Sequence, residues 1–238
     1  MEQLLLIVLY TALAGAALPA GGAIASIERI RPYWLEQELR HGVLAFGGGI
    51  LLAAVALVLV PEGLRMLSAF AALPCFILGG CVFMLVDRAT VRSGTPVSNL
   101  LAALSDFLPE AVALGALIAS ESRLGALLAL FIGLQNVPEG FNAYREMVAG
   151  GRLEPRTTLL ALSGAVALGP VCGLIGLWLL SDAPRATGAT MMFAAGGILY
   201  LTFQDIAPEA KLSRHWGPPL GAVLGFATGL LGTSLLGR

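Results

Sequence analysis

Eight long apolar stretches constrain the fold of this chain more than any other feature of its sequence. Each holds roughly 20 mostly apolar residues, the number that a helix needs to cross a hydrocarbon core about 30 Å thick. Backbone N–H and C=O groups cannot stay unpaired in lipid, so each stretch is expected to be helical. The stretches are Leu4–Ile24, Gly42–Val60, Ala69–Val86, Ser98–Ser120, Leu124–Tyr144, Thr157–Leu180, Thr187–Ile206 and Pro219–Leu236.

The composition agrees with membrane burial. Charged residues make up 12% of the chain, against about 25% in soluble domains, and the mean hydropathy is +0.85. A net charge of −1 gives no reason to expect a nucleic acid partner. The longest connection between apolar stretches is Glu28–Arg40. We therefore expect an all-α integral membrane protein of eight transmembrane helices, forming one polytopic domain over residues 1–238 and surrounded by the lipid bilayer.

The distribution of Lys and Arg predicts the orientation in the membrane. Cytoplasmic loops carry an excess of these residues. The loops after the first, third, fifth and seventh helices hold ten of the 14, and the opposite side holds Arg65, Arg123, Arg185 and Arg238. The sequence thus predicts a multi-pass protein of the cell (inner) membrane with both termini outside the cytoplasm. The ten are Arg29, Arg31, Arg40, Arg88, Arg92, Arg145, Arg152, Arg156, Lys211 and Arg214.

Two of the stretches resemble each other. In the second, Phe46-Gly-Gly-Gly-Ile-Leu lies fifteen residues before Pro61-Glu62-Gly63. In the seventh, Phe193-Ala-Ala-Gly-Gly-Ile-Leu lies fifteen residues before Pro208-Glu209-Ala210. An odd number of crossings separates these helices, so they run in opposite directions. The pattern indicates an inverted repeat, a common transporter architecture, although chance similarity of two Gly-rich segments is the alternative.

The fourth and fifth stretches share a polar motif near their centres. The fourth reads Ser105-Asp-Phe-Leu-Pro-Glu-Ala, and the fifth reads Gln135-Asn-Val-Pro-Glu-Gly. The spacing of four places Asp106 with Glu110, and Gln135 with Glu139, on one helix face. The Pro before each Glu cannot donate a backbone hydrogen bond and leaves a carbonyl oxygen short of a helical partner.

Ionisable residues at membrane depth are costly and usually functional. A bound cation would compensate Asp106, Glu110 and Glu139 at once, because it pairs the charges and uses the oxygen atoms. The alternative is that some of these carboxyls are protonated or line a wet cavity. Asn142 and Glu146 follow Glu139 on the same helix face and are candidates for an inner path toward the cytoplasm. The alternative is that they form an ordinary polar helix end.

These motifs resemble the metal-binding core of the ZIP (Zrt-, Irt-like) divalent metal transporters, and the resemblance covers nearly the whole chain. It is most specific at Gln135-Asn-Val-Pro-Glu-Gly, and it extends to the end of the seventh stretch from Tyr200 to Ala210. The chain is identified as a divergent, bacterial-type member. The resemblance implies an inverted repeat of helices 1–3 and 6–8 around helices 4 and 5, uptake toward the cytoplasm, and suggests a homodimer.

The departures from the family pattern are specific. The family's fourth helix reads His-Asn-x-Pro-Glu-Gly, where this chain has Asp106, Phe107 and finally Ala111. The family's bridging Glu in the sixth helix is replaced by Gly169. The resemblance therefore implies one metal site rather than two. The metal ligands it carries over are Asp106, Glu110, Gln135 and Glu139, with Asn136, Asn142 and Asp205 as further candidates.

The sequence thus predicts a transporter of a divalent cation of the zinc, manganese or iron class, with the metal ion as its substrate and no cofactor. The alternative is a non-transporting ZIP-like protein, a sensor or scaffold with a degenerate metal site. An enzyme is not expected. Asp106 and Asp205 are the only suggestion of an intramembrane aspartyl protease pair. The zinc-protease motif His-Glu-x-x-His and the serine-hydrolase motif Gly-x-Ser-x-Gly do not occur in the sequence.

Overall fold

The computed structural model describes the chain apart from residues 29–32, 94–95, 121, 150–152, 212–215 and 237–238. The side chains of residues 33–34, 90–93, 96–103, 106, 120, 122 and 149 also lie outside the description, although their backbone is helical. Every regular element in the described part is a helix. The expectation of an all-α protein is confirmed for that part.

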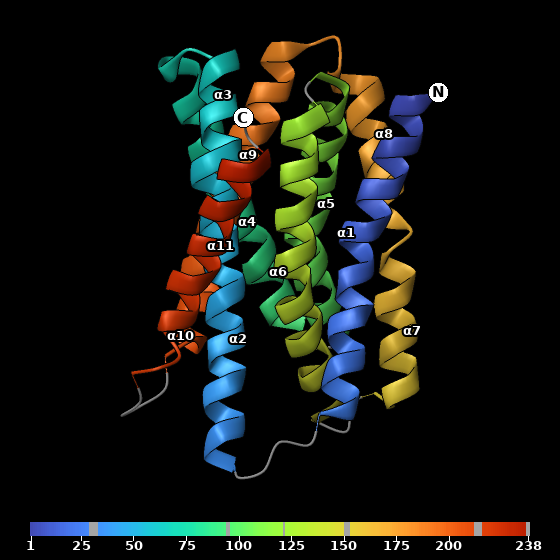
Figure 1. The fold of residues 1–238 in the computed structure, drawn as a ribbon, viewed down its shortest axis with the longest axis vertical. Coiled ribbons are helices and arrows are strands. Elements are labelled where there is room, and N and C mark those ends of the chain that lie inside the picture. The colour runs from blue at the N-terminus through green and yellow to red at the C-terminus, as the bar shows by residue number, and fades with distance from the viewer. Residues whose placement is uncertain (29–32, 94–95, 121, 150–152, 212–215, 237–238) are drawn as a thin grey trace.

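The helices form eight long rods, drawn in Figure 1. Five rods are single helices: α1 (Glu2–Ile27), α4 (Ala69–Ser93), α5 (Pro96–Ser120), α6 (Ser122–Ala149) and α11 (Leu220–Leu236). Three are composite: α2 (Tyr33–Ala54) with η1 (Val55–Leu59) and α3 (Val60–Met66); α7 (Pro155–Ala165) with α8 (Leu168–Leu180); and α9 (Pro184–Leu201) with η2 (Thr202–Ile206) and α10 (Ala207–Glu209).

Each rod coincides with one of the predicted apolar stretches. Among the described residues, six helical segments are long and apolar enough to cross a membrane, and two apolar helices, Phe107–Ala119 and Leu220–Leu236, are shorter. A multi-pass helical membrane protein is therefore confirmed. The first connection was predicted wrongly, because α2 already begins at Tyr33 and takes in most of Glu28–Arg40. Charged residues do not end a helix, and no Gly or Pro follows Pro32 until Gly42.

Both chain termini lie at the same end of the molecule, the upper end in Figure 1. This is the arrangement that an even number of crossings produces. The last turn of α1 and the first turn of α2 lie at the opposite end.

The rods pack mainly within two groups. One group contains α1, α5, α6 and the α7–α8 rod; the other contains the α2–α3 rod, α4, the α9–α10 rod and α11. The groups meet where α2 contacts α6 and where α5 contacts α9. Helices α5 and α6, which carry the polar motifs, thus lie in one group and face the other.

Glycines permit the closest helix contacts. A Cβ atom on Gly79 of α4 would lie 1.9 Å from the carbonyl oxygen of Phe193, and one on Gly196 of α9 would lie 1.9 Å from that of Phe76. No side chain fits at such distances, so α4 and α9 approach each other backbone to backbone, as small residues allow in membranes.

Two rods carry a π-helical turn at matching positions. η1 begins at Val55, nine residues after Phe46, and η2 begins at Thr202, nine residues after Phe193. Each turn precedes its Pro by six residues, at Pro61 and Pro208. Such turns widen a helix locally and often occur near functional sites.

Candidate metal centre

Glu110 and Gln135 meet between α5 and α6 in the interior of the protein. Both residues are 0% exposed. The Nε2 atom of Gln135 donates a hydrogen bond of 2.7 Å to Oε2 of Glu110. The two polar motifs, 25 residues apart in the sequence, therefore face each other across adjacent helices.

Glu139 lies one helical turn beyond Gln135 on α6. The residue is partly buried, and both of its carboxylate oxygens are shielded from solvent. The spacing of four places Glu139 on the same face of α6 as Gln135. The arrangement offers two buried carboxylates and one amide, of which the Oε1 atom of Gln135 has no hydrogen-bond partner among the described residues.

Asp106 lies one turn before Glu110 on α5, but its side chain is outside the described part of the structure. The described side chains contain no group of three His, Cys, Asp or Glu residues close enough to hold a metal. Glu110 and Glu139 are two acidic candidates, and Gln135 is a candidate of another type. A third acidic ligand at this centre would be Asp106, as the sequence predicts.

Asn136 faces another helix. Its Nδ2 atom donates a hydrogen bond of 2.8 Å to the carbonyl oxygen of Ala14 on α1. The residue is fully buried, and its Oδ1 atom has no hydrogen-bond partner among the described residues. Asn136 thus anchors α6 to α1 and presents a single neutral oxygen.

The ring of Phe107 occupies the space between α1 and α8. Phe107 is fully buried. A Cβ atom on Gly15 would lie 3.0 Å from its Cζ atom, and one on Gly169 would lie 2.8 Å from the same atom. The two positions where the resemblance predicted missing ligands, Phe107 and Gly169, are therefore in direct contact, and the aromatic ring fills the room that Gly169 leaves.

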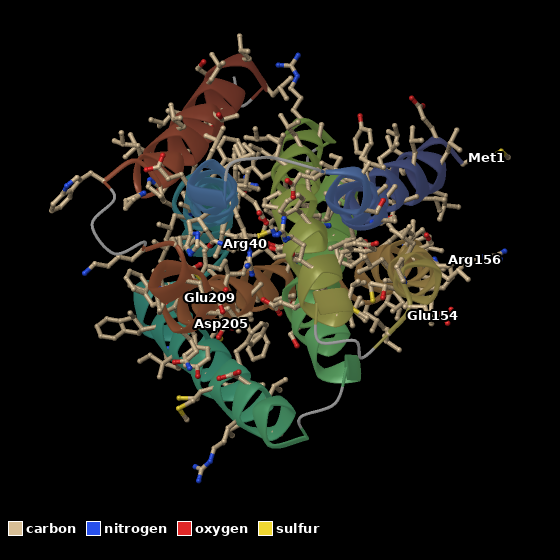
Figure 2. The ribbon with its side chains drawn as sticks, turned by 90° about the horizontal axis from the view of Figure 1, so that it is seen from below. Met1, Arg40, Glu154, Arg156, Asp205 and Glu209 are labelled. Carbon is tan, nitrogen blue, oxygen red and sulfur yellow. The ribbon has the colours of Figure 1, made fainter. Side chains whose placement is uncertain are left out.

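Asn142 and Asp205 lie away from the Glu110–Gln135 contact. Asn142 is two turns beyond Gln135 on α6 and is 8% exposed, and neither Nδ2 nor Oδ1 has a hydrogen-bond partner in the described part of the chain. Asp205 is half-buried in η2 and lies within electrostatic range of Asp87 and Glu209; Asp205 and Glu209 are labelled in Figure 2. The structure places Asn142 along the same helix as the centre and Asp205 at the end of another rod.

Arg145 has a role that the sequence analysis missed. Its guanidinium group donates to the carboxylates of Glu28, just after α1, and of Glu36 on α2, and it lies 5.7 Å from the ring centroid of Phe141. The residue therefore ties the lower ends of α1, α2 and α6 together. No local pattern could reveal pairs that are 117 and 109 residues apart.

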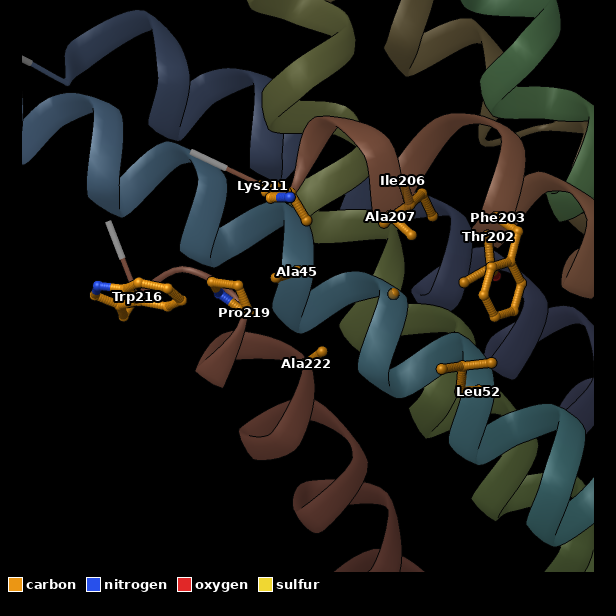
Figure 3. Close-up of a pocket in the computed structure, with 12 residues that line it drawn as sticks. Ala45, Leu52, Thr202, Phe203, Ile206, Ala207, Lys211, Trp216, Pro219 and Ala222 are labelled. Atoms are coloured by element: carbon orange, nitrogen blue, oxygen red, sulfur yellow. The ribbon is translucent and has the colours of Figure 1, made fainter. Parts of the chain in front are cut away.

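A separate cavity of about 450 Å³ lies between α2, the α9–α10 rod and α11 (Figure 3). Its lining is apolar apart from Thr202 and Lys211. An apolar cavity with a cationic side chain does not suit a divalent cation, so the Glu110–Gln135 contact remains the candidate metal centre.

Comparison with known proteins gives one informative similarity. No family model matches the chain. The chain is 29% identical over 115 residues to a protein described as zinc transporter zipt-7.1 from Caenorhabditis briggsae. The match covers 47% of this chain and 29% of the relative's length, so the chain matches less than a third of that protein.

Proposed function

We propose that this multi-pass membrane protein transports a divalent metal cation, and that the ion is held between α5 and α6. Glu110, Gln135 and Glu139 are the ligands, joined by Asp106. The buried hydrogen bond between Gln135 and Glu110 is the observation that carries the proposal. It brings a carboxylate and an amide from two membrane helices to one point, where an ionised group is costly unless compensated.

The oxygen ligands support a range of cations. Carboxylate and amide oxygens suit manganese and other hard dications, and zinc also accepts Asp and Glu ligands. The relative is a zinc transporter, which points to a transporter and not an enzyme. We propose zinc, manganese or iron as the substrate, with the metal ion as cargo.

The architecture supports a place for this chain as a divergent, bacterial-type member of the ZIP family. We propose that helices 1–3 and 6–8 are inverted repeats around α5 and α6. The π turns η1 and η2 stand at the same offset in the second and seventh rods. The helix packing supports the repeat. If the first half of the chain is exchanged with the second, the contact between α1 and α6 corresponds to the contact between α8 and α5. In the same way, the contact between α2 and α11 corresponds to the contact between α9 and α4.

Location and assembly follow from charge and resemblance. The excess of Lys and Arg at one end supports an orientation in the cell membrane with both termini outside the cytoplasm, and the resemblance supports a homodimer. A reporter fused after Arg238 should be active only in a format that folds outside the cytoplasm. Activity of a reporter that works only in the cytoplasm would overturn this topology.

The transport proposal is tested with purified protein in liposomes that contain a zinc-responsive fluorophore. We expect zinc uptake by the wild type, and loss of uptake and of zinc binding in Glu110→Gln and Glu139→Gln. Glu154→Gln is the matched control, because Glu154 is exposed at the start of α7. Uptake that survives both substitutions would contradict the assignment of the centre.

A second candidate is a non-transporting sensor or scaffold with the same fold. The observation that favours it is the Phe107 ring, which fills the space beside Gly169. A sensor of this kind would bind the metal with the same dependence on Glu110 and Glu139 but would show no uptake into liposomes.

A further inference from the structure

Four polar residues form a stripe along one face of α6. Gln135, Glu139, Asn142 and Glu146 are separated by four, three and four residues. At 3.6 residues per turn they fall within an arc of about 60°, over a rise of about 16 Å. The stripe runs from the candidate centre to the end of the helix that carries Arg145.

The opposite side of α6 is closed by α1. A Cβ atom on Gly140 would lie 1.9 Å from the carbonyl oxygen of Leu18, and one on Gly21 would lie 2.0 Å from that of Val137. Backbones at these distances leave no room for a side chain. The polar stripe therefore faces away from α1, toward the seam where the two groups of helices meet.

The two ends of the stripe differ in exposure. Gln135 is 0% exposed, Glu139 is partly buried, Asn142 is 8% exposed, and Glu146 is exposed. Asn142 is thus more than nine-tenths buried, and both of its polar side-chain atoms lack a hydrogen-bond partner among the described residues. An amide buried without partners is unfavourable, so such a group indicates that something else occupies its donor and acceptor positions.

The Glu146 end of the stripe is acidic. Glu146 lies within electrostatic range of Glu209 and Asp205 from the α9–α10 rod and of Arg40 from α2, and these three residues are labelled close together in Figure 2. Three acidic groups and one basic group leave an excess of negative charge. This negative charge would attract a dication from the centre along the stripe toward Glu146.

We infer that Asn142 is an inner ligand for the transported dication, which passes from the site of Glu110, Gln135 and Glu139 to the Oδ1 atom of Asn142 before it reaches Glu146. The inference rests on the proposed function. Glu139 is shared between the two positions, because it lies one turn from Gln135 and three residues from Asn142. A neutral oxygen suits this role, since an ion in transit must be bound weakly enough to leave.

The test compares Zn²⁺ binding with Zn²⁺ movement in purified full-length protein. For Asn142→Leu we expect Zn²⁺ affinity and stoichiometry at the centre to stay within about twofold of the wild type. The maximal rate of Zn²⁺ uptake into liposomes should fall about tenfold, the effect of losing one contact to a charged group. Thr158→Val is the control, because Thr158 is also buried and its hydroxyl donates locally, to the carbonyl oxygen of Glu154 at the start of α7.

Asn142→Asp gives an independent measurement with a side chain of the same size. A carboxylate next to Glu139 should hold Zn²⁺ longer, so release of bound ⁶⁵Zn²⁺ after chelator addition should slow about tenfold. Wild-type uptake in Asn142→Leu, or wild-type release in Asn142→Asp, would overturn the inference. So would a loss of equilibrium binding in Asn142→Leu, since Asn142 would then serve the centre itself. Failure of the wild type to bind or transport Zn²⁺ would refute the proposed function instead.

Discussion

Replacement of Gln135 by Leu tests the candidate centre most directly. The substitution keeps the approximate size of the side chain and removes both the donor to Glu110 and the Oε1 atom. The hydrogen bond is 2.7 Å long, and both residues are fully buried. A buried hydrogen bond to a charged group contributes about 1.5–3 kcal/mol. Because each 1.4 kcal/mol is a tenfold change in affinity, zinc binding should weaken by about 12- to 140-fold.

The assay is zinc titration of purified protein in detergent, with calorimetry or a competing chelator as the readout. The matched control is Asn136→Leu, the neighbouring buried amide, whose Nδ2 atom bonds to Ala14 instead. We expect this control to change zinc affinity less than about threefold, although it removes a hydrogen bond of similar length. Equal losses in the two variants would refute the reasoning, because the effect would then reflect general damage to α6 rather than loss of a ligand from the centre.

Three further predictions concern stability and metal choice. Arg145→Met should lower stability by about 1–3 kcal/mol, because it breaks partly buried ion pairs to Glu28 and Glu36. Thermal unfolding in detergent measures this, and Arg65→Met should change stability less, because the Arg65 side chain is exposed. Gly79→Ala should prevent folding, because its Cβ atom would meet a backbone oxygen at 1.9 Å, whereas Gly164→Ala has nothing within 4 Å; monodisperse protein from both would contradict the packing. Asp106→His should shift competition between zinc and manganese toward zinc, because imidazole nitrogen is the softer ligand, and an unchanged preference would show that Asp106 is not a ligand.

The helices could be predicted from the sequence because membrane crossing is a local property. A run of about 20 apolar residues needs no information about its neighbours to be helical, and each predicted stretch corresponds to a rod in the structure. The start of α2 was missed because its first residues include Glu36, Glu38 and Arg40 and lie outside the apolar run. The hydropathy of the sequence indicates where the apolar, membrane-spanning part of a helix begins, but a helix can start several residues earlier.

For the candidate centre, the sequence predicted which residues share one face of a helix, but not which residues of neighbouring helices they contact. Spacing of four placed Gln135 with Glu139 on one face, and the structure brings Gln135 to Glu110 of the neighbouring helix. The direction of Asn136 toward α1 could not be foreseen, because adjacent residues on a helix point about 100° apart and only the packing decides which neighbour each one meets. The Arg145 ion pairs depend on three helix ends and were invisible for the same reason.

The contact between Phe107 and Gly169 joins two departures that the sequence showed only separately. Each was noted as a missing ligand, one on the fourth helix and one on the sixth. In the structure a Cβ atom at Gly169 would lie 2.8 Å from the Phe107 ring, so any larger side chain at position 169 competes with the ring for the same space. The carbonyl oxygen of Thr11 would lie 2.7 Å from the same Cβ atom, so backbone and ring together exclude a carboxylate there. A second dication at this place would be surrounded by an aromatic ring and backbone, without a carboxylate to balance its charge. This packing supports the expectation of one metal site rather than two.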